Sequence, residues 1–192
     1  MAESRITLTF EKFIDQDLDE LRLIKAARQD PRVFGELYKR YVEQIFRYLY
    51  SRLGNVHEAE DITAQTFLAA FESYYKFRQD GHFASWLFTI ARNKAMDRFR
   101  RQKKTSFIDV VDDISVEKDP LYRVIQSEQT AALSKLIQAL PDEDRELLRL
   151  RFLADMSFPE MAHFLYRKEE AVKKSIYRLL ARLKSQVEAS NE

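Results

Sequence analysis

The chain has 192 residues, 45% of them hydrophobic and 33% charged, so it can bury one ordinary core or two small ones. It contains no cysteine, which excludes a disulfide framework and a thiolate zinc site, and its three glycines lie too far apart for a glycine-rich phosphate-binding loop. The net charge of +1 hides a strong segregation, with acids around Asp109–Asp119 and bases in Arg92–Lys104 and Arg167–Lys184.

The first residues, MAESRITLTFEKFIDQD, have neither the basic start nor the apolar core of a signal peptide. No apolar run approaches the roughly 18 residues that span a bilayer. We therefore expect a cytoplasmic protein without membrane insertion. Within residues 1–17, Ile6–Phe10 alternates like a short strand but has no identifiable partner, so this extension stays unassigned.

Three helices are predicted next. The first covers Leu18–Arg28 and ends at Asp30-Pro31, a pair that can also cap and open the second helix, which should stop at Gly54-Asn55. The third runs from about His57 to Phe77. Their inward faces are expected to carry Leu21, Ile24 and Ala27, then Phe34, Leu37, Tyr38, Tyr41, Val42, Ile45, Phe46 and Leu49, then Ile62, Thr66, Phe67, Ala70, Phe71 and Tyr74.

The outer face of the third helix mixes polar and apolar residues. Asp61, Gln65 and Leu68 are spaced three and four residues apart, opposite the buried side. This mixture is typical of a surface for a partner protein, although a solvated surface fits the spacing about equally well.

The next helix, Phe83–Lys104, changes character along its length. Its first half has the apolar spacing of a buried helix, with Trp86 and Leu87 on the stripe. Its second half, Arg92–Lys104, holds seven basic residues and the single acid Asp97, a net charge of +6. A basic rod fixed to a core suits binding along an anionic polymer such as nucleic acid, and the alternative is a solvated basic end.

Aromatic and basic residues alternate just before this helix. Tyr75, Lys76, Phe77 and Arg78 precede a short loop that turns at Gly81. Bases that leave a duplex need flat apolar surfaces and nearby cations, and stacking contributes roughly 1–3 kcal/mol per base. The neighbouring rings Tyr74, Phe83 and Trp86 are expected in the core, whereas a core role is less well supported for Tyr75 and Phe77.

Thr105–Asp119 contains five acids and one base without helical periodicity, and we interpret it as a flexible acidic linker. A second helical unit follows. Helices are expected at Leu121–Ala139, after Pro141, and after Ser157, whose Ser-x-x-Glu spacing predicts a capping box. A break at Tyr166-Arg167-Lys168 precedes Glu169–Val187, so that the last two helices form a helix-turn-helix. This last helix should turn Val172, Ile176, Leu179, Leu180 and Leu183 inward and Lys173, Lys174, Arg178 and Arg182 outward.

Several stretches resemble the sigma-70 family of transcription initiation factors. FGELYKRYVEQIFRYLYSRLGN, AEDITAQTFLAAF and FASWLFTIARNKAMDRFRR resemble its conserved helical domain, region 2. ALPDEDRELLRLRFLADMSFPEMAHFL and EEAVKKSIYRLLARL resemble its C-terminal helix-turn-helix domain, region 4. With only these two domains and a short linker, the chain is similar to the extracytoplasmic-function (ECF, group IV) class.

The resemblance implies an all-α chain with an extension at residues 1–17, a region 2-like domain at 18–104, a linker at 105–120 and a region 4-like domain at 121–192. It implies promoter DNA and core RNA polymerase, through the β′ clamp helices and the β flap, as partners, with an anti-sigma factor as a further candidate. It assigns polymerase binding to Asp61, Gln65 and Leu68, −10 reading and melting to Tyr75, Lys76, Phe77, Arg78, Arg92, Asn93, Lys94 and Arg98, and −35 reading to Lys173, Lys174, Tyr177 and Arg178.

The sequence departs from the family pattern at two places. Ala64 stands where the family often has glutamine, with Gln65 one position later. Tyr166 stands where a glycine is usual in the helix-turn-helix turn, and Lys168 where a serine-type cap is usual. The family pattern is therefore a weaker guide to the surface of the third helix and to the turn geometry than to the rest of the chain.

Two rival functions fit the sequence less well. His57-Glu58-Ala59-Glu60-Asp61 resembles the H-E-x-x-H zinc motif, but its fifth residue is a carboxylate and the other histidines, His82 and His163, are distant. We therefore expect no metal, no cofactor and no catalysis. A stand-alone helix-turn-helix regulator with a ligand-sensing N-terminal domain is the nearer rival, and it would bind duplex DNA unaided, usually as a symmetric dimer.

Overall fold

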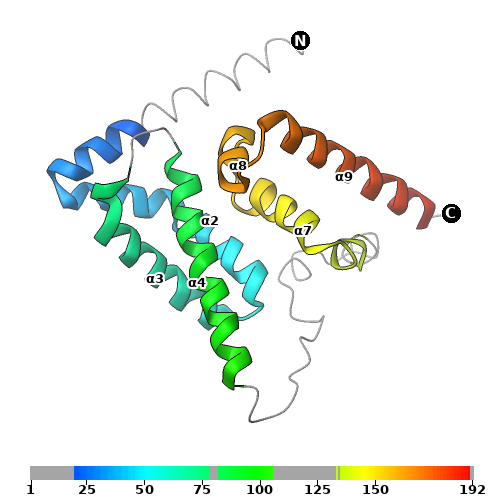
Figure 1. Ribbon diagram of the computed structural model, residues 1–192, viewed down its shortest axis with the longest axis horizontal. Helices are drawn as coiled ribbons and strands as arrows, with labels where there is room; N and C mark the ends of the chain where they lie inside the picture. Colours follow the sequence, from blue (N-terminus) through cyan, green and yellow to red (C-terminus); the bar gives the residue numbers. More distant parts are fainter. Residues whose placement is uncertain (1–19, 78–81, 106–132, 134, 191–192) are drawn as a thin grey trace.

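The computed structural model describes residues 20–77, 82–105, 133 and 135–190 (Figure 1). Within these ranges all regular elements are helical, which confirms the expected all-α class. The strand-like Ile6–Phe10, nearly all of the expected linker and most of the helix expected at Leu121–Ala139 lie outside the described residues.

The N-terminal domain is a bundle of long helices. A helix at residues 20–29 leads into the short 3-10 turn η1 (Pro31–Val33) and then α2 (Phe34–Leu53), α3 (Val56–Ser73), the 3-10 turn η2 (Tyr74–Lys76) and α4 (Phe83–Thr105). α3 and α4 pack on each other and on α2. The basic helix predicted from the charge pattern is therefore α4, and its apolar half is fixed in the bundle (Figure 1).

The ends of these helices follow their sequence signals. The Asp30 side chain accepts a hydrogen bond from the Arg32 backbone N–H at 3.0 Å, and Pro31 occupies the first helical position, although the first turn is 3-10 rather than α. Gly54 ends α2 with φ 68°, a left-handed conformation that suits glycine. Asn55 then caps α3 by accepting from the Glu58 N–H at 3.0 Å.

The core contains most of the residues expected in it. Ile45, Leu49, Phe83 and Leu87 are almost fully buried, and each such side chain contributes roughly 1.5–3 kcal/mol to stability. Three residues expected on inward faces lie at the edge of the core instead. These are Tyr38, Phe71 and Leu180, which are 44%, 42% and 36% exposed. The Tyr38 ring packs on Phe67 and the Phe71 ring on Phe34, and both rings remain partly open to solvent.

The C-terminal domain is a helix-turn-helix built on a short scaffold. It contains α7 (Asp142–Leu148), the π-helical turn η4 (Arg149–Leu153), α8 (Phe158–Leu165) and α9 (Glu169–Ser190). The predicted capping box is present, because the Ser157 hydroxyl accepts from the Glu160 N–H while the Glu160 carboxylate accepts from the Ser157 N–H. The π-helical turn was not predicted.

The turn between α8 and α9 is made without glycine. Tyr166 adopts the left-handed conformation, φ 54° and ψ 42°, and ends α8 while its ring is 83% exposed. The Arg167 N–H donates to the Ala162 carbonyl at 2.9 Å, which completes the helix end. The helix-turn-helix geometry is therefore kept at the expense of backbone strain in a residue with a Cβ atom.

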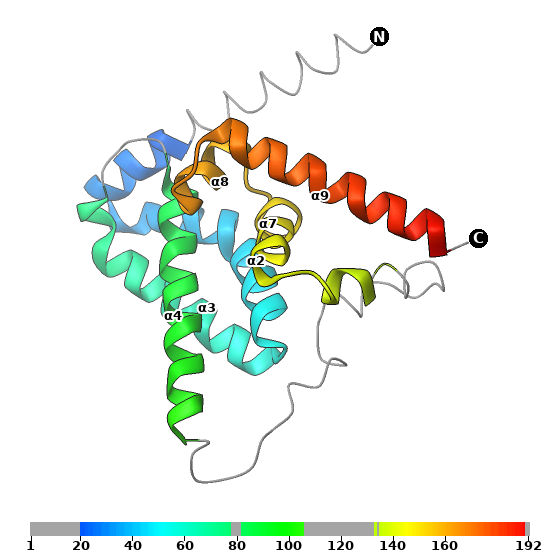
Figure 2. The same ribbon diagram turned by 45° about the vertical axis from the view of Figure 1, so that its right-hand side comes forward.

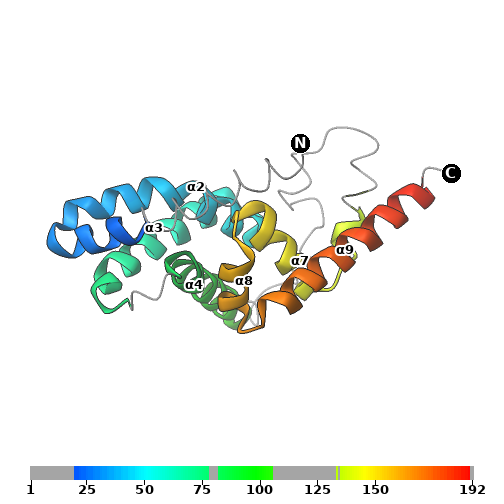
Figure 3. The ribbon, with the colours of Figure 1, turned by 90° about the horizontal axis from the view of Figure 1, so that it is seen from above.

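The two domains pack directly against each other (Figures 2 and 3). α8 lies against α4, and η4 lies against α2. Ser85 Oγ donates to the Glu160 carbonyl at 2.7 Å, and the guanidinium carbon of Arg92 lies 4.5 Å from the centre of the Phe164 ring. The sequence patterns did not predict this contact, since they describe each domain separately.

A buried carboxylate is at the centre of the domain contact. Glu146 of α7 is 9% exposed and accepts from the Tyr48 hydroxyl of α2 at 2.7 Å and from the Arg52 guanidinium. Arg149, 5% exposed, lies 3.6 Å from the same carboxylate. Burial and the nearby Glu146 charge raise the pKa of Tyr48, so that its hydroxyl stays neutral and donates.

Replacing Tyr166 with glycine should stabilise the C-terminal domain by about 1 kcal/mol. A non-glycine residue in the left-handed region costs roughly 1–2 kcal/mol, and the greater freedom of glycine in the unfolded chain offsets part of that gain. The measurement is urea denaturation followed by far-UV circular dichroism. Tyr166→Ala is the matched control, because it removes the same exposed ring but keeps the Cβ atom, and an equal gain in that variant would contradict the strain.

Candidate nucleic-acid interface

The basic half of α4 leaves some of the predicted DNA-binding residues accessible to solvent and holds others in contacts with neighbouring helices. Asn93 is exposed and Lys94 is half-buried. Arg98 donates to Glu58 of α3 at 2.6 Å, and Arg92 lies under Phe164 of α8. The predicted set is therefore brought onto one helix, but two of its four members already have intramolecular partners.

The η2 turn carries an exposed aromatic residue beside a cation. Tyr75 is 59% exposed, and Lys76 Nζ lies 5.3 Å from the centre of the Tyr75 ring. A lysine at this distance interacts with the ring face and also offers positive charge to an anion. Of the four residues predicted here, these two form an accessible aromatic and cationic surface.

The structure does not place the other two residues predicted in this group, Phe77 and Arg78, on that accessible surface. Phe77 is only 6% exposed, because its ring packs 5.5 Å from Phe83 and 5.2 Å from Trp86, measured between ring centres. Its ring is not available for stacking in this structure, contrary to the expectation of an exposed residue, and it anchors the turn instead. Arg78 lies outside the described residues.

The N-terminal part of α9 forms a second polar surface. Lys174 and Arg178 are exposed, and Tyr177 is 63% exposed. Lys173 donates to Glu169 at 2.8 Å and Glu170 at 3.2 Å, and these bonds raise its pKa. The four predicted residues therefore lie on one face, with the charge of Lys173 partly balanced by two acids.

The outer face of α3 is a mixed surface, as predicted. Gln65 Nε2 donates to Asp61 Oδ2 at 2.7 Å, and both side chains are exposed. Leu68 is 58% exposed one turn further on, beside the partly exposed Phe71. The structure thus places the three predicted residues together on the exposed face of α3.

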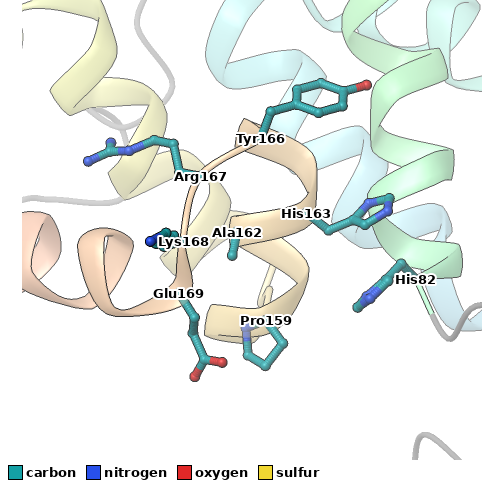
Figure 4. A pocket seen from close by; sticks show the side chains of 8 residues that line it. All are labelled: His82, Pro159, Ala162, His163, Tyr166, Arg167, Lys168 and Glu169. Atoms are coloured by element: carbon teal, nitrogen blue, oxygen red, sulfur yellow. The ribbon is translucent and has the colours of Figure 1, made fainter.

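A shallow hollow lies where the turn between α8 and α9 approaches the start of α4 (Figure 4). Its volume is about 500 Å³. The His82 and His163 rings stack across the domain contact with their centres 4.3 Å apart. In the part of the chain that the structure describes, neither this hollow nor any other place gathers three side chains that could hold a metal ion. The lining residues are His82, Pro159, Ala162, His163, Tyr166, Arg167, Lys168 and Glu169.

Sequence reasoning missed the residues that support these surfaces. Arg28 donates to the Phe77 carbonyl, and the Tyr74 hydroxyl donates to the Ala27 carbonyl at 2.8 Å. A single arginine on an exposed helix face gives no periodic signal, so no pattern in the sequence could have identified the first contact.

Comparison with known proteins identifies both domains. Residues 37–105 match Sigma-70 region 2, and residues 130–183 match Sigma-70 region 4. The ECF RNA polymerase sigma factor BldN of Streptomyces coelicolor is 33% identical over 175 residues, which cover 87% of this chain and 66% of BldN. The ECF RNA polymerase sigma factor SigW of Bacillus subtilis is 28% identical over 180 residues, which cover 86% of this chain and 95% of SigW.

A solved structure supports the same assignment. CnrH in complex with the cytosolic domain of CnrY superposes with a TM-score of 0.61 at 27% identity, over 88% of this chain and 97% of that chain. None of the helices in the described ranges has the length and apolarity needed to cross a membrane.

Proposed function

Because the chain belongs to the sigma-70 family of RNA polymerase sigma factors, in its ECF class, we propose a division of the family's work among the surfaces described above. A sigma factor directs core RNA polymerase to promoters and starts transcription there. The observation that carries this function is the presence of regions 2 and 4 on one chain in the family's order.

The N-terminal domain would read and melt the −10 element. The exposed pair Tyr75 and Lys76 supplies a ring on which an unpaired base can stack and a cation for its phosphate. Asn93 and Lys94 of α4 would make further contacts to the same element, whereas Arg92 and Arg98 would first have to leave Phe164 and Glu58. Phe77 is left out of the stacking set because its ring is buried.

The C-terminal domain would read the −35 element through α9. The recognition helix of a helix-turn-helix places residues of its first turns in the major groove. Lys174, Tyr177 and Arg178 are exposed on that part of α9, and Lys173 would exchange its two carboxylate partners for DNA. We assign no enzymatic activity to any of these groups.

The outer face of α3, with Asp61, Gln65 and Leu68, would bind the β′ clamp helices of core polymerase, and the C-terminal domain would meet the β flap. CnrH was solved with the cytosolic domain of CnrY bound, so an anti-sigma partner is part of this proposal. We propose that the protein acts in the cytoplasm, where bacterial promoters are located.

The closed arrangement of the domains cannot serve both promoter elements at once. The −35 and −10 elements lie about 25 base pairs apart, which is roughly 85 Å along the duplex at about 3.4 Å per base pair. In the structure α8 contacts α4 directly, with Arg92 4.5 Å from the centre of the Phe164 ring. Promoter recognition would therefore require the two domains to separate.

The function is tested by run-off transcription with a purified bacterial core polymerase on templates whose upstream segment is randomised. The holoenzyme should enrich templates that share two spaced elements, while core polymerase alone enriches none. Duplex binding by the isolated protein as a symmetric dimer, without transcription, would favour the rival regulator instead. An enriched template is called the selected promoter below.

Asp61→Arg should abolish binding to core polymerase while the thermal melt stays unchanged. Exposed charge substitutions rarely unfold a domain, and this one reverses a charge on the docking face of α3. Co-elution with core polymerase on gel filtration is the measurement. Glu43→Arg, the same change on an exposed residue of α2, is the control, and normal co-elution of Asp61→Arg would remove this surface from the proposal.

Locking the domains together should block transcription. Arg47 of α2 pairs with Asp155 after η4 at 3.1 Å, and the chain has no cysteine of its own, so Arg47→Cys with Asp155→Cys offers two reactive sites. A short bismaleimide crosslinker with a reducible bond should abolish run-off transcription from the selected promoter, and reduction should restore it. The single-cysteine variants, treated in the same way, are the controls, and an active crosslinked protein would contradict domain separation.

A further inference from the structure

The η2 turn, which presents Tyr75 and Lys76, is held at both of its ends by one short segment. The Tyr74 hydroxyl donates to the Ala27 carbonyl at 2.8 Å, and the Arg28 guanidinium donates to the Phe77 carbonyl. Ala27 and Arg28 are neighbours in the last turn of the helix at residues 20–29. The carbonyls of a last turn have no partner within their helix, so the Tyr74 hydroxyl also completes that helix end.

That helix is itself fixed to the bundle. Ile24 and Ala27 are 1% and 0% exposed in the core. At the other end, buried Glu20 accepts a hydrogen bond from the hydroxyl of Tyr41 in α2, and burial together with the Glu20 charge raises the pKa of Tyr41. Tyr41 therefore remains a neutral donor, and the helix forms a rigid bridge from α2 to η2.

We infer that Arg28 is a positioning residue for promoter opening, which holds the η2 turn so that Tyr75 faces an unpaired base. This inference rests on the proposed function of the turn. A hydrogen bond from a charged donor is about twice as strong as a neutral one and fixes direction as well as distance. Phe77, packed on Phe83 and Trp86, fixes the side-chain end of the turn, and Arg28 fixes its backbone.

The alternative role for an exposed arginine beside a DNA surface is a direct phosphate contact. The two roles differ in what they predict. A phosphate contact weakens all complexes alike and lowers the salt slope of binding by about one, whereas a positioning residue leaves the closed complex and its salt slope unchanged. A positioning effect must also disappear once Tyr75 is absent, because it acts only through that ring.

The experiment uses the full chain in the holoenzyme on the selected promoter. Arg28→Ala should lower the fraction of open complex, measured by permanganate reactivity of opened thymines, by about tenfold, in line with the loss of one charge-assisted hydrogen bond. On a promoter with a pre-melted bubble, run-off transcription by Arg28→Ala should return to the wild-type level. Arg22→Ala, on the same helix and also exposed, removes the same charge and should have no effect.

Two further variants test whether Arg28 acts on promoter opening through the η2 turn and Tyr75. Tyr74→Phe removes the second hydrogen bond to the same turn and should reproduce the opening defect in milder form. In the Tyr75→Ala background, Arg28→Ala should add nothing. The inference is overturned by wild-type opening in Arg28→Ala, by a full additional defect in the Tyr75→Ala background, or by a salt slope lower by about one. Failure of the wild-type chain to select any promoter would instead contradict the proposed function.

Discussion

The arrangement of the two domains depends on one buried carboxylate. Glu146 is buried inside the contact, and Tyr48, Arg52 and Arg149 surround its carboxylate with donors. Removing one partner from such a pair costs roughly 3–5 kcal/mol, since an uncompensated charge remains, yet the intact pair adds little net stability over water. Such a contact is specific when the domains are closed. Its opening costs little free energy, because water forms hydrogen bonds to the same groups when the domains separate.

The contact and the promoter would compete for one side chain. Arg92 is half-buried against Phe164 in the closed structure, and in the proposed function the same guanidinium faces DNA. While the guanidinium lies on the Phe164 ring, α8 covers part of it and a phosphate can reach only the rest. Closing the domains would therefore weaken the proposed DNA contact of Arg92, and a phosphate contact there would favour the open form, which is reciprocal coupling between two sites.

Local structure could be predicted from the sequence, whereas the domain contact could not. The Asp30 cap, the Gly54 stop and the Ser157 capping box depend on residues within four positions of each other, and all three were predicted. Glu146 follows an acidic first turn that suits a helix dipole, and nothing nearby indicates a partner 98 residues away. The exposure of Phe77 could not be predicted for the same reason. An aromatic residue beside a basic one has the same local sequence whether its ring is buried or exposed.

The two sides of α4 would let the domains part without disturbing the proposed melting surface. Phe83 and Leu87 face the N-terminal core, and Phe83 also supports Phe77 at the end of η2. Ser85 and Arg92, seven residues apart and so on one face, meet α8. Separation would uncover polar groups on α4 and the Phe164 ring of α8, while the apolar support of Tyr75 would stay inside its own domain. A contact that joins polar groups to one aromatic ring resembles the more polar interfaces between domains that move.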